Sequence, residues 1–334
     1  MLRTRYTAAV LYLGALIIVI GLVLQGVLQL IPAAVIALGF MPFAVIPLLL
    51  ARQRELDLRN RVQFVQERLD YLWEIQAAQY RAQRLSNVRF NDPKRLSRRE
   101  SKVYSQAGED GMLREVFHRI GTSNKVFVEF GIGSGSENNT VFLLRHQKWS
   151  GLWMDGNPAA ERMVRKQFAS DIESNRLTFA REFITPSNIE GLFKTYGIPE
   201  QFDLLSIDVD GNDYWIWKAI THYRPRVLVL EYNAIYPPGV EAVMPYDPTY
   251  EHEFGSPWET SSHWGASLTS WQTLNDEKGY SLVGCNIDGV DAIFVRNDLL
   301  GDHFCSPYTA ENHYEQPMYP SQWSKHGAYR RQPL

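Results

Sequence analysis

Acidic and amide side chains follow two apolar segments of the sequence, where each segment would end as a β-strand. Asp208 and Asp210 come at the end of segment 202–208, and Glu231 and Asn233 at the end of segment 226–232. The carboxyl ends of neighbouring parallel strands meet at one edge of a sheet, so these side chains should converge in one crevice. Their oxygens can bind Mg²⁺ or another hard cation, which would acidify a hydroxyl group held beside it.

Other roles for these acids stay open. The two aspartates can instead only organise the turn and hold a ligand, without a metal ion. A base would then come from Asp210, or from His252 or His263 in the following loop. The catalytic candidates are therefore Asp208, Asp210 and His252, and the metal-ligand candidates are Asp208, Asp210, Glu231 and Asn233.

A glycine-rich turn follows another apolar segment, 126–130. Glycine at alternate positions, 131, 133 and 135, lets the backbone turn tightly and approach a ligand closely. The dinucleotide-binding spacing G-x-G-x-x-G would need a glycine where Ser136 stands. At the end of the next predicted strand, 150–156, Asp155 can accept hydrogen bonds from both ribose hydroxyls of a nucleotide-like cofactor. An ordinary strand-to-helix turn is the alternative for the glycines.

These residues require a regular framework. From Ser105 onward, apolar strands alternate with helices, which predicts a doubly wound α/β sheet. The first strand is apolar except for Glu129, as expected of a sheet covered on both faces. Strands are predicted at 126–130, 150–156, 177–184, 202–208 and 226–232, followed by an antiparallel hairpin at 280–285 and 291–296.

The linked motifs resemble the FkbM-like branch of class I S-adenosylmethionine (SAM) methyltransferases, over about residues 103–300. The resemblance rests on SQ and GEDG near 105–111, VFVEFGIGSGSENNT at 126–140, GLWMDG at 151–156, SIDVDGNDYWIW at 206–217 and VLVLEYN at 227–233. It implies a Rossmann-like seven-stranded SAM-methyltransferase sheet and, commonly, O-methylation of sugar or natural-product hydroxyls. Many family members carry D-x-E-G where this chain has Asp208-Val209-Asp210-Gly211.

The same resemblance implies a set of cofactor-binding residues. In the E-x-G-x-G-x-G spacing, Glu129 would face the amino acid portion or the sulfonium of SAM, and Asp155 would hold the ribose. The expected set is Glu129, Gly131, Gly133, Gly135, Asp155 and Phe183.

The loop 236–264 is rich in tyrosine and tryptophan, which predicts a lid over the acceptor or packing on the sheet edge. From Val227 to Glu277 there are eight acidic residues and no Lys or Arg. Such a surface repels phosphate and disfavours nucleic acid as a partner. A neutral polyol or a cationic acceptor fits better, and the aromatic residues favour a glycan.

The N-terminal region has a different composition. No charged residue occurs from Thr7 to Ala51, and arginines flank both ends. We expect a transmembrane hairpin in residues 1–50, with helices at about 8–30 and 33–50 and a turn near Pro32. The flanking arginines predict that both ends, and the domain that follows, are cytoplasmic.

A helical neck is predicted at 51–85. Residues Leu58, Val62, Val65, Leu69 and Leu72 follow a heptad spacing that Gln76 and Gln79 continue. This pattern predicts either an oligomerising coiled coil or a single amphipathic helix on the domain or the membrane surface. Residues 51–104 hold 13 Lys or Arg against 7 Asp or Glu, which favours contact with anionic lipid.

The remaining segments complete the expected organisation. A linker is predicted at 86–104, a methyltransferase-like domain at 105–305 and an unassigned tail at 306–334. Together these features predict a membrane-anchored, SAM-dependent O-methyltransferase that faces the cytoplasm and acts on a sugar, a glycolipid or another hydroxylated small molecule. The alternative is a non-catalytic membrane scaffold or trafficking protein with the same fold.

Overall fold

The computed structural model describes residues 30–248 and 265–318, together with Gly14, Leu16, Ile17 and Ile20. The chain divides into two compact units, residues 1–78 and 79–334. His252 and His263 lie outside the described residues, as does most of the first helix expected in the N-terminal hairpin.

A single helix, α2, runs from Leu30 to Leu85. This helix includes both the second apolar segment, 33–50, and the predicted neck, 51–85. The helix therefore continues without interruption past residue 50, where we expected the hairpin to end. Pro32 lies in its first turn, where a proline costs no helical hydrogen bond. Within the part of the chain that the structure describes, none of the helices has the length and hydropathy that crossing a membrane requires.

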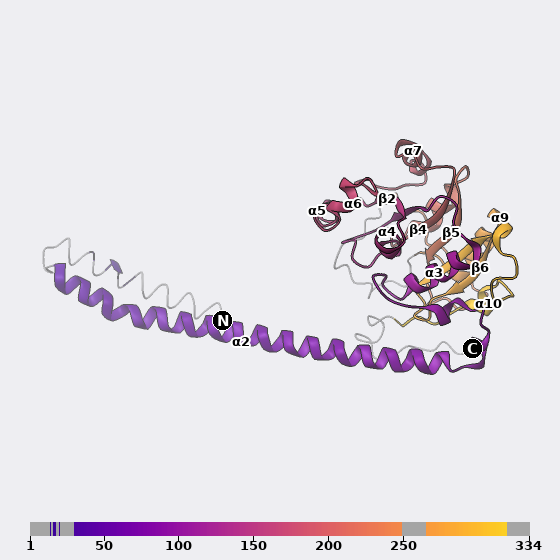
Figure 1. The fold of residues 1–334 in the computed structure, drawn as a ribbon. Helices are drawn as coiled ribbons and strands as arrows, with labels where there is room; N and C mark the ends of the chain where they lie inside the picture. Colours follow the sequence, from indigo (N-terminus) through magenta and orange to yellow (C-terminus); the bar gives the residue numbers. More distant parts are fainter. Residues whose placement is uncertain (1–13, 15, 18–19, 21–29, 249–264, 319–334) are drawn as a thin grey trace. The chain divides into compact units, whose positions relative to one another are not determined.

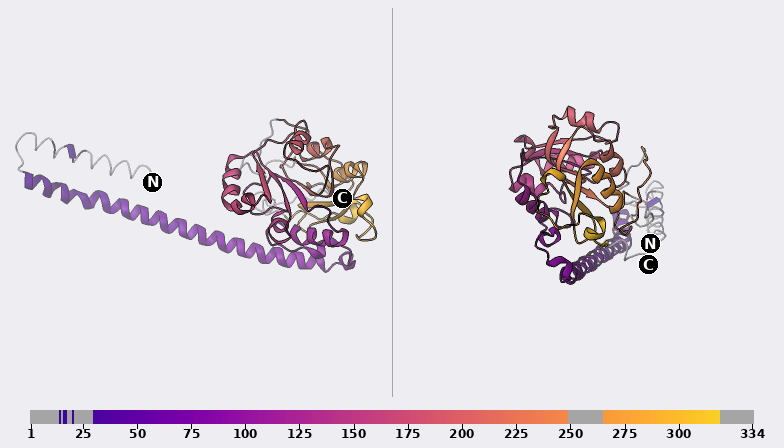
Figure 2. Two further views of the ribbon diagram at one scale, coloured as in Figure 1. Left: turned by 45° about the horizontal axis from the view of Figure 1, so that its top comes forward. Right: turned by 90° about the vertical axis from the view of Figure 1, so that its right-hand side faces the viewer.

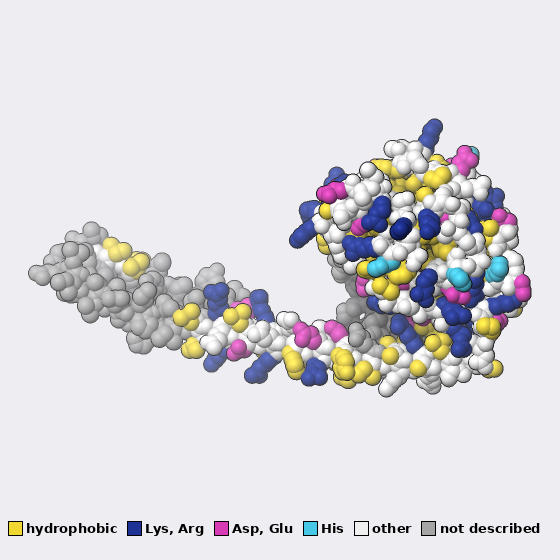
Figure 3. Space-filling view, in the orientation of Figure 1, with side chains coloured by type: hydrophobic (Ala, Val, Ile, Leu, Met, Phe, Trp, Pro, Cys, Tyr) yellow, Lys and Arg dark blue, Asp and Glu magenta, His cyan; other side chains and the backbone are white. Residues whose placement is uncertain are grey.

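The heptad residues of α2 are exposed. Leu58, Val62, Val65, Leu69 and Leu72 each expose between 54% and 64% of their surface. Apolar side chains lie along this part of the helix in Figure 3. Polar side chains between them bond one another along the helix, as Arg59 does with Glu55 at 3.1 Å.

The second unit is built on a seven-stranded sheet (Figure 1). Its order is β3-β2-β1-β4-β5-β7-β6, with β7 antiparallel to both neighbours and the other pairs parallel. This confirms the predicted α/β sheet with a terminal antiparallel hairpin. The strands are β1 Val126–Phe130, β2 Ser150–Met154, β3 Leu177–Ala180, β4 Gln201–Ile207, β5 Arg224–Glu231, β6 Tyr280–Cys285 and β7 Asp291–Arg296.

Helices cover both faces of the sheet, as the two further views in Figure 2 show. Alternate residues of β1 enter opposite cores: Phe127 packs with α3, α4 and α5, whereas Val128 packs with α7, α8 and α9. The helices are α3 Glu109–Ile120, α4 Val141–His146, α5 Pro158–Gln167, α6 Ala169–Glu173, α7 Ile189–Thr195, α8 Asp213–Ala219, α9 Leu268–Lys278 and α10 Ala310–His313. Three 3₁₀ helices are η1 Val88–Asn91, η2 Leu96–Arg99 and η3 Asn297–Leu299.

Residues 86–104 and the described part of the predicted tail, 306–318, pack against the sheet domain. In the segment 86–104, Phe90 and Leu96 are only 2% and 1% exposed. Leu96 packs directly against Gly284 of β6. Beyond residue 305, His313 and Glu315 are buried. Isolated apolar residues in short aperiodic segments give no periodic signal, so the sequence pattern did not reveal this packing.

Arginines in the last turns of α2 and in η1 pair with carboxylates of the domain. Arg81 binds Asp288 in the turn between β6 and β7, and its Nε lies 2.8 Å from Oδ1. Arg84 and Arg89 both pair with the buried Glu315. These three arginines are therefore engaged within the second unit.

Candidate active site

The three glycines of the turn after β1 have different surroundings, although all have positive φ. At Gly131, with φ 68°, a Cβ atom would lie 1.4 Å from the carbonyl oxygen of Asp208. At Gly135 it would lie 3.0 Å from Phe168 at the end of α5. At Gly133, with φ 50°, it would meet no atom within 4 Å. Gly131 and Gly135 thus allow close packing, and only Gly133 borders open space that a ligand can enter.

Asp155 lies beside this turn, immediately after β2. Its Oδ2 accepts a hydrogen bond from the Gly133 amide at 2.9 Å, and its Oδ1 accepts one from the Asn157 amide at 2.7 Å. Burial raises the pKa of Asp155, and these two hydrogen bonds oppose the rise. Each oxygen keeps a further lone pair, so the carboxylate can also accept from a ribose hydroxyl. The structure therefore brings together the glycine turn and the acid that the sequence pattern linked.

Phe183 lies beyond the end of β3, which is shorter than the predicted strand 177–184. Phe183 is 45% exposed, and a Cβ atom at Gly156 would lie 3.6 Å from its ring. An exposed aromatic face next to Asp155 suits the planar base of a nucleotide-like cofactor.

Glu129 is buried and bonded to the start of α4. Its Oε1 accepts from the Asn139 amide at 2.8 Å, and its Oε2 accepts from the Thr140 hydroxyl at 2.5 Å. The Trp153 indole donates in turn to the Thr140 hydroxyl at 2.7 Å. Burial raises the pKa of Glu129 to about 7 despite these hydrogen bonds. The contacts give Glu129 a role in fixing the turn, and its contact with a cofactor stays a prediction.

The predicted acidic residues do meet at the ends of β4 and β5. Carboxylate oxygens of Asp208, Asp210 and Glu231 all lie within 4.8 Å of one another. Burial, followed by repulsion from neighbouring carboxylates, raises the pKa values of Asp208 and Glu231 well above the usual range. These oxygens can hold a hard cation or share protons.

The turn after β4 has a backbone conformation that places Asp210 beside the other carboxylates. Asp210 has φ 62°, a left-handed conformation that is uncommon outside glycine. Asp213, the first residue of α8, accepts hydrogen bonds from the amides of Val209 at 2.7 Å and Gly211 at 2.9 Å. Burial raises the pKa of Asp213 to about 6. Asp213 therefore supports the turn that presents Asp210.

The amide candidate Asn233 lies after β5 and is buried. Its Oδ1 accepts a hydrogen bond from the Ile235 amide at 3.1 Å, and its own backbone amide bonds Ala266 at 2.8 Å. These contacts stabilise the start of the loop, and metal binding by Asn233 stays a prediction.

The sequence analysis missed further polar residues at this edge of the sheet. Asp291 pairs in register with Glu231 across β5 and β7. The side-chain amide of Asn139 bonds Ser206 at 3.2 Å and Asp291 at 3.4 Å. Burial, then the neighbouring Glu109, raises the pKa of Asp291 well above the usual range. Only the pairing of β7 with β5 brings Asp291 here, and residue spacing cannot reveal that pairing.

Comparisons with known proteins assign no family to this chain. No family model matches the chain, and no curated protein matches it. Its structural neighbours include an S-adenosylmethionine-dependent methyltransferase from Clostridium acetobutylicum ATCC 824, with 11% identity, a TM-score of 0.34, and coverage of 55% of this chain and 89% of that chain.

Two other solved structures are similar to a comparable degree. The N-terminal domain of EvdMO1 with SAH bound has 15% identity, a TM-score of 0.37, and coverage of 58% of this chain and 82% of that chain. The CurJ carbon methyltransferase has 10% identity, a TM-score of 0.36, and coverage of 56% and 52%. At these scores the three structures assign no activity to this chain.

Proposed function

We propose that this chain is a SAM-dependent O-methyltransferase that acts on a hydroxyl group of a sugar, a glycolipid or another small molecule. One observation carries the proposal. The Gly133 amide, beside open space, donates a hydrogen bond to Asp155 at 2.9 Å. This contact lies at the carboxyl ends of the strands, next to the point between β1 and β4 where the strand order reverses. Ligands of open α/β sheets bind at such a point.

The residues at this point fit the cofactor. Asp155 would accept hydrogen bonds from the ribose hydroxyls, Phe183 would stack on the adenine ring, and the space at Gly133 would admit the chain of the ligand. When bound, SAM supplies an activated methyl group. The remaining requirements, alignment of the acceptor and removal of its proton, fall to residues of this chain.

The acids after β4 are suited to proton removal. Burial, followed by repulsion from neighbouring carboxylates, raises the pKa of Asp208, so this carboxylate takes up a proton more readily than an exposed aspartate does. Asp210 belongs to the same cluster. In our proposal this pair would accept the proton of the acceptor hydroxyl as its oxygen takes the methyl group, with the carbon–sulfur bond of SAM breaking and S-adenosylhomocysteine leaving. His252 remains a further candidate base.

The proposal includes a divalent cation as a second component. Three carboxylates within 4.8 Å of one another repel strongly, and a cation such as Mg²⁺ would relieve that repulsion and acidify the acceptor hydroxyl. Calorimetric titration with Mn²⁺ should show binding that Asp210→Asn removes. If no Mn²⁺ binds and turnover is unchanged in excess chelator, the cation is refuted. The three carboxylates would then relieve their repulsion by sharing protons.

Calorimetry with SAM tests the central claim. Asp155→Ala should abolish binding, whereas Asp298→Ala, at an exposed acid in η3, should leave it unchanged. Asp210→Ala should bind SAM and lose turnover, measured as a mass gain of one methyl group on acceptors in membrane extracts. A folded chain that does not bind millimolar SAM would instead favour a non-catalytic scaffold or trafficking role.

We further propose that the N-terminal region attaches the protein to the cytoplasmic face of a membrane, through a hairpin in residues 1–50. Support comes from the absence of charge between residues 7 and 51 and from the flanking arginines. Retention in the membrane pellet after an alkaline wash is expected. Release by that wash would refute the hairpin.

The exposed heptad row of α2 is proposed to pair with another copy of the chain. Leu69 and Leu72, each more than half exposed, belong to that row. Leu69→Lys should lower the mass measured by analytical ultracentrifugation, while Gln66→Lys, off the row, should not. A monomeric wild-type chain would favour the alternative of a single amphipathic helix.

A further inference from the structure

Exposed basic side chains gather on the face of the sheet that α3, α4 and α5 cover. Figure 3 shows Lys and Arg side chains, in dark blue, spread over this part of the domain. Arg145, at the end of α4, donates a hydrogen bond to the carbonyl of Gln167 at the end of α5, at 3.1 Å, so the two helix ends adjoin. We call this group the basic face, and its members are Arg114, Arg145, Lys148, Arg162, Arg165 and Lys166.

Most of the charge on the basic face is not neutralised by neighbouring acids. Arg165 pairs with Glu161 at 2.9 Å, and Arg145 lies 3.6 Å from the buried Asp171. Within the part of the chain that the structure describes, the other four basic side chains form no ion pair. Their positive charge faces solvent and therefore attracts an anionic surface.

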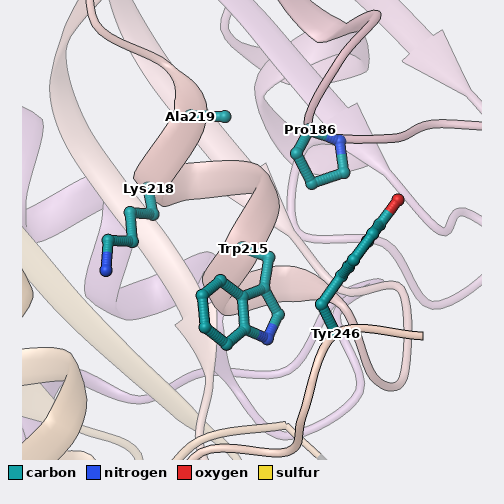
Figure 4. Close-up of a pocket in the computed structure, with 5 residues that line it drawn as sticks. All are labelled: Pro186, Trp215, Lys218, Ala219 and Tyr246. Carbon is teal, nitrogen blue, oxygen red and sulfur yellow. The ribbon is translucent and has the colours of Figure 1, made fainter. Parts of the chain in front are cut away.

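The opposite face of the sheet, covered by α7, α8 and α9, carries a different surface. Beside α8 lies an almost wholly apolar pocket, whose lining residues are Pro186, Trp215, Lys218, Ala219 and Tyr246 (Figure 4). The segment 227–277, which supplies Tyr246 and α9, holds eight acids and no Lys or Arg. The charge of the domain is thus polarised across the sheet, which would turn the basic face toward an anionic surface.

The arginines at the end of the neck are less available for such contact than their sequence suggests. Arg81, Arg84 and Arg89 pair with Asp288 and Glu315 inside the domain. The contact with anionic lipid that the composition of residues 51–104 favours therefore has a more exposed counterpart in the basic face.

The outer side of α5 indicates which kind of anionic partner fits. Met163 is 42% exposed and lies on this helix with the exposed Arg162 and Lys166. An exposed apolar side chain among cationic ones suits the boundary between lipid headgroups and acyl chains. A surface for single-stranded nucleic acid would instead offer aromatic rings on which bases stack. In α4 the Phe142 ring is already stacked on His146, with ring centres 5.2 Å apart.

We propose that the basic face docks the domain onto a membrane surface that contains anionic lipid. The helix α5 begins just after Asp155, whose Oδ1 accepts a hydrogen bond from the Asn157 amide at 2.7 Å. This helix is about 15 Å long, so docking through α5 would hold the turn at Gly133 near the lipid headgroups. The proposal concerns a different surface from residues 1–50, and it requires neither an inserted helix nor bound SAM.

A fluorescent label on the full chain tests the docking of this face. Cys285 and Cys305 are buried, so an environment-sensitive thiol dye should react at the cysteine introduced by Met163→Cys. We expect vesicles of phosphatidylcholine and phosphatidylserine to shift the emission of the dye to the blue, and vesicles of phosphatidylcholine alone to leave it unchanged. High salt should reverse the shift, because it screens the attraction between exposed charges. The matched label, Glu277→Cys at an exposed residue of α9, should not respond.

Charge reversal gives the quantitative comparison, in chains labelled at position 163. Lys166→Glu and Lys194→Glu each change an exposed lysine in the last turn of a helix, in α5 and α7 respectively. Lys166→Glu should weaken docking by about tenfold or more, because it removes one attractive charge and adds a repulsive one. The chain would then need more phosphatidylserine to reach half of the emission shift. Lys194→Glu, on the opposite face, should dock like the wild type.

Three results would overturn the proposal. The first is a label at position 163 that responds equally to both kinds of vesicle, or to neither. The second is an equal effect of the two charge reversals. The third is a shift caused by an oligonucleotide and not by anionic vesicles, which would assign the face to nucleic acid. The dye reports this face whether or not residues 1–50 enter the bilayer, so a failure of the proposed hairpin is distinguished from a failure of docking.

Discussion

Single alanine substitutions in the glycine turn should separate packing from ligand binding. Gly131, Gly133 and the remote Gly197 all have positive φ, at 68°, 50° and 68°. An alanine in this conformation costs about 1–2 kcal/mol. No atom lies within 4 Å of a Cβ at Gly133 or Gly197. These two variants should therefore lose similar stability, which lowers the unfolding temperature by roughly 2–8 °C.

Gly131→Ala should lower the free energy of unfolding much more than the other two substitutions. Its Cβ would lie 1.4 Å from the Asp208 carbonyl oxygen, so the loops after β1 and β4 would have to separate. Overpacking of this kind adds about 1–3 kcal/mol or more to the cost of the left-handed conformation. The total, about 2–5 kcal/mol, is a large part of the 5–15 kcal/mol that stabilises a typical domain.

Urea unfolding and SAM calorimetry on the three variants give the decisive comparison. Gly133→Ala should bind SAM at least about tenfold more weakly than Gly197→Ala, since its methyl group enters the ligand space. Equal stability of Gly131→Ala and Gly197→Ala would refute the close approach to Asp208. Equal SAM affinity of Gly133→Ala and Gly197→Ala would refute the assignment of that space to the cofactor.

Three further substitutions probe buried polar contacts, each measured by urea unfolding. Asp203→Asn should cost about 3–5 kcal/mol, because it breaks a fully buried pair with Arg226 at 2.8 Å; a loss below about 1 kcal/mol would contradict this. Thr140→Val should cost about 1–3 kcal/mol by leaving the Trp153 indole unpaired; wild-type stability would show that another acceptor replaces the hydroxyl. Because the pKa of Glu129 is raised to about 7 in the folded state, the unfolded chain releases this proton first as pH rises. The Glu129 contribution to stability should therefore fall by about 3 kcal/mol between roughly pH 4.5 and 7, and Glu129→Gln should flatten that fall; an unchanged profile would refute the shift.

The sequence predicted the framework of the domain better than the details of its site. Alternating apolar strands and helices predicted the sheet, and Asp208, Asp210 and Glu231 meet after β4 and β5. The glycine pattern did not show which glycine borders open space. Position 131 must be glycine because a Cβ atom there would collide with the carbonyl oxygen of Asp208, a residue more than seventy positions later in the sequence.

Long-range pairing explains the other residues that were missed. Asp291 reaches the acidic edge only through its register with Glu231. Phe90 and Glu315 join the fold through contacts with distant elements, and neither lies in a periodic segment. Tyr246 and Trp215 form one pocket because Asn212 ties their segments together. Local pattern contains no information on such contacts.

The arginine pairs at the end of α2 have a mechanical consequence. Arg81 forms an ion pair with Asp288 in the β6–β7 turn. The Met318 amide donates a hydrogen bond to the carbonyl of the same residue at 2.9 Å. Two other residues of this hairpin, Asn286 and Asp291, contact Glu109 and Asn139 beside the acidic cluster. A displacement of the last turns of α2 would therefore act on the β6–β7 hairpin through Arg81, and on the end of β5 through Arg84, Glu315 and Tyr232.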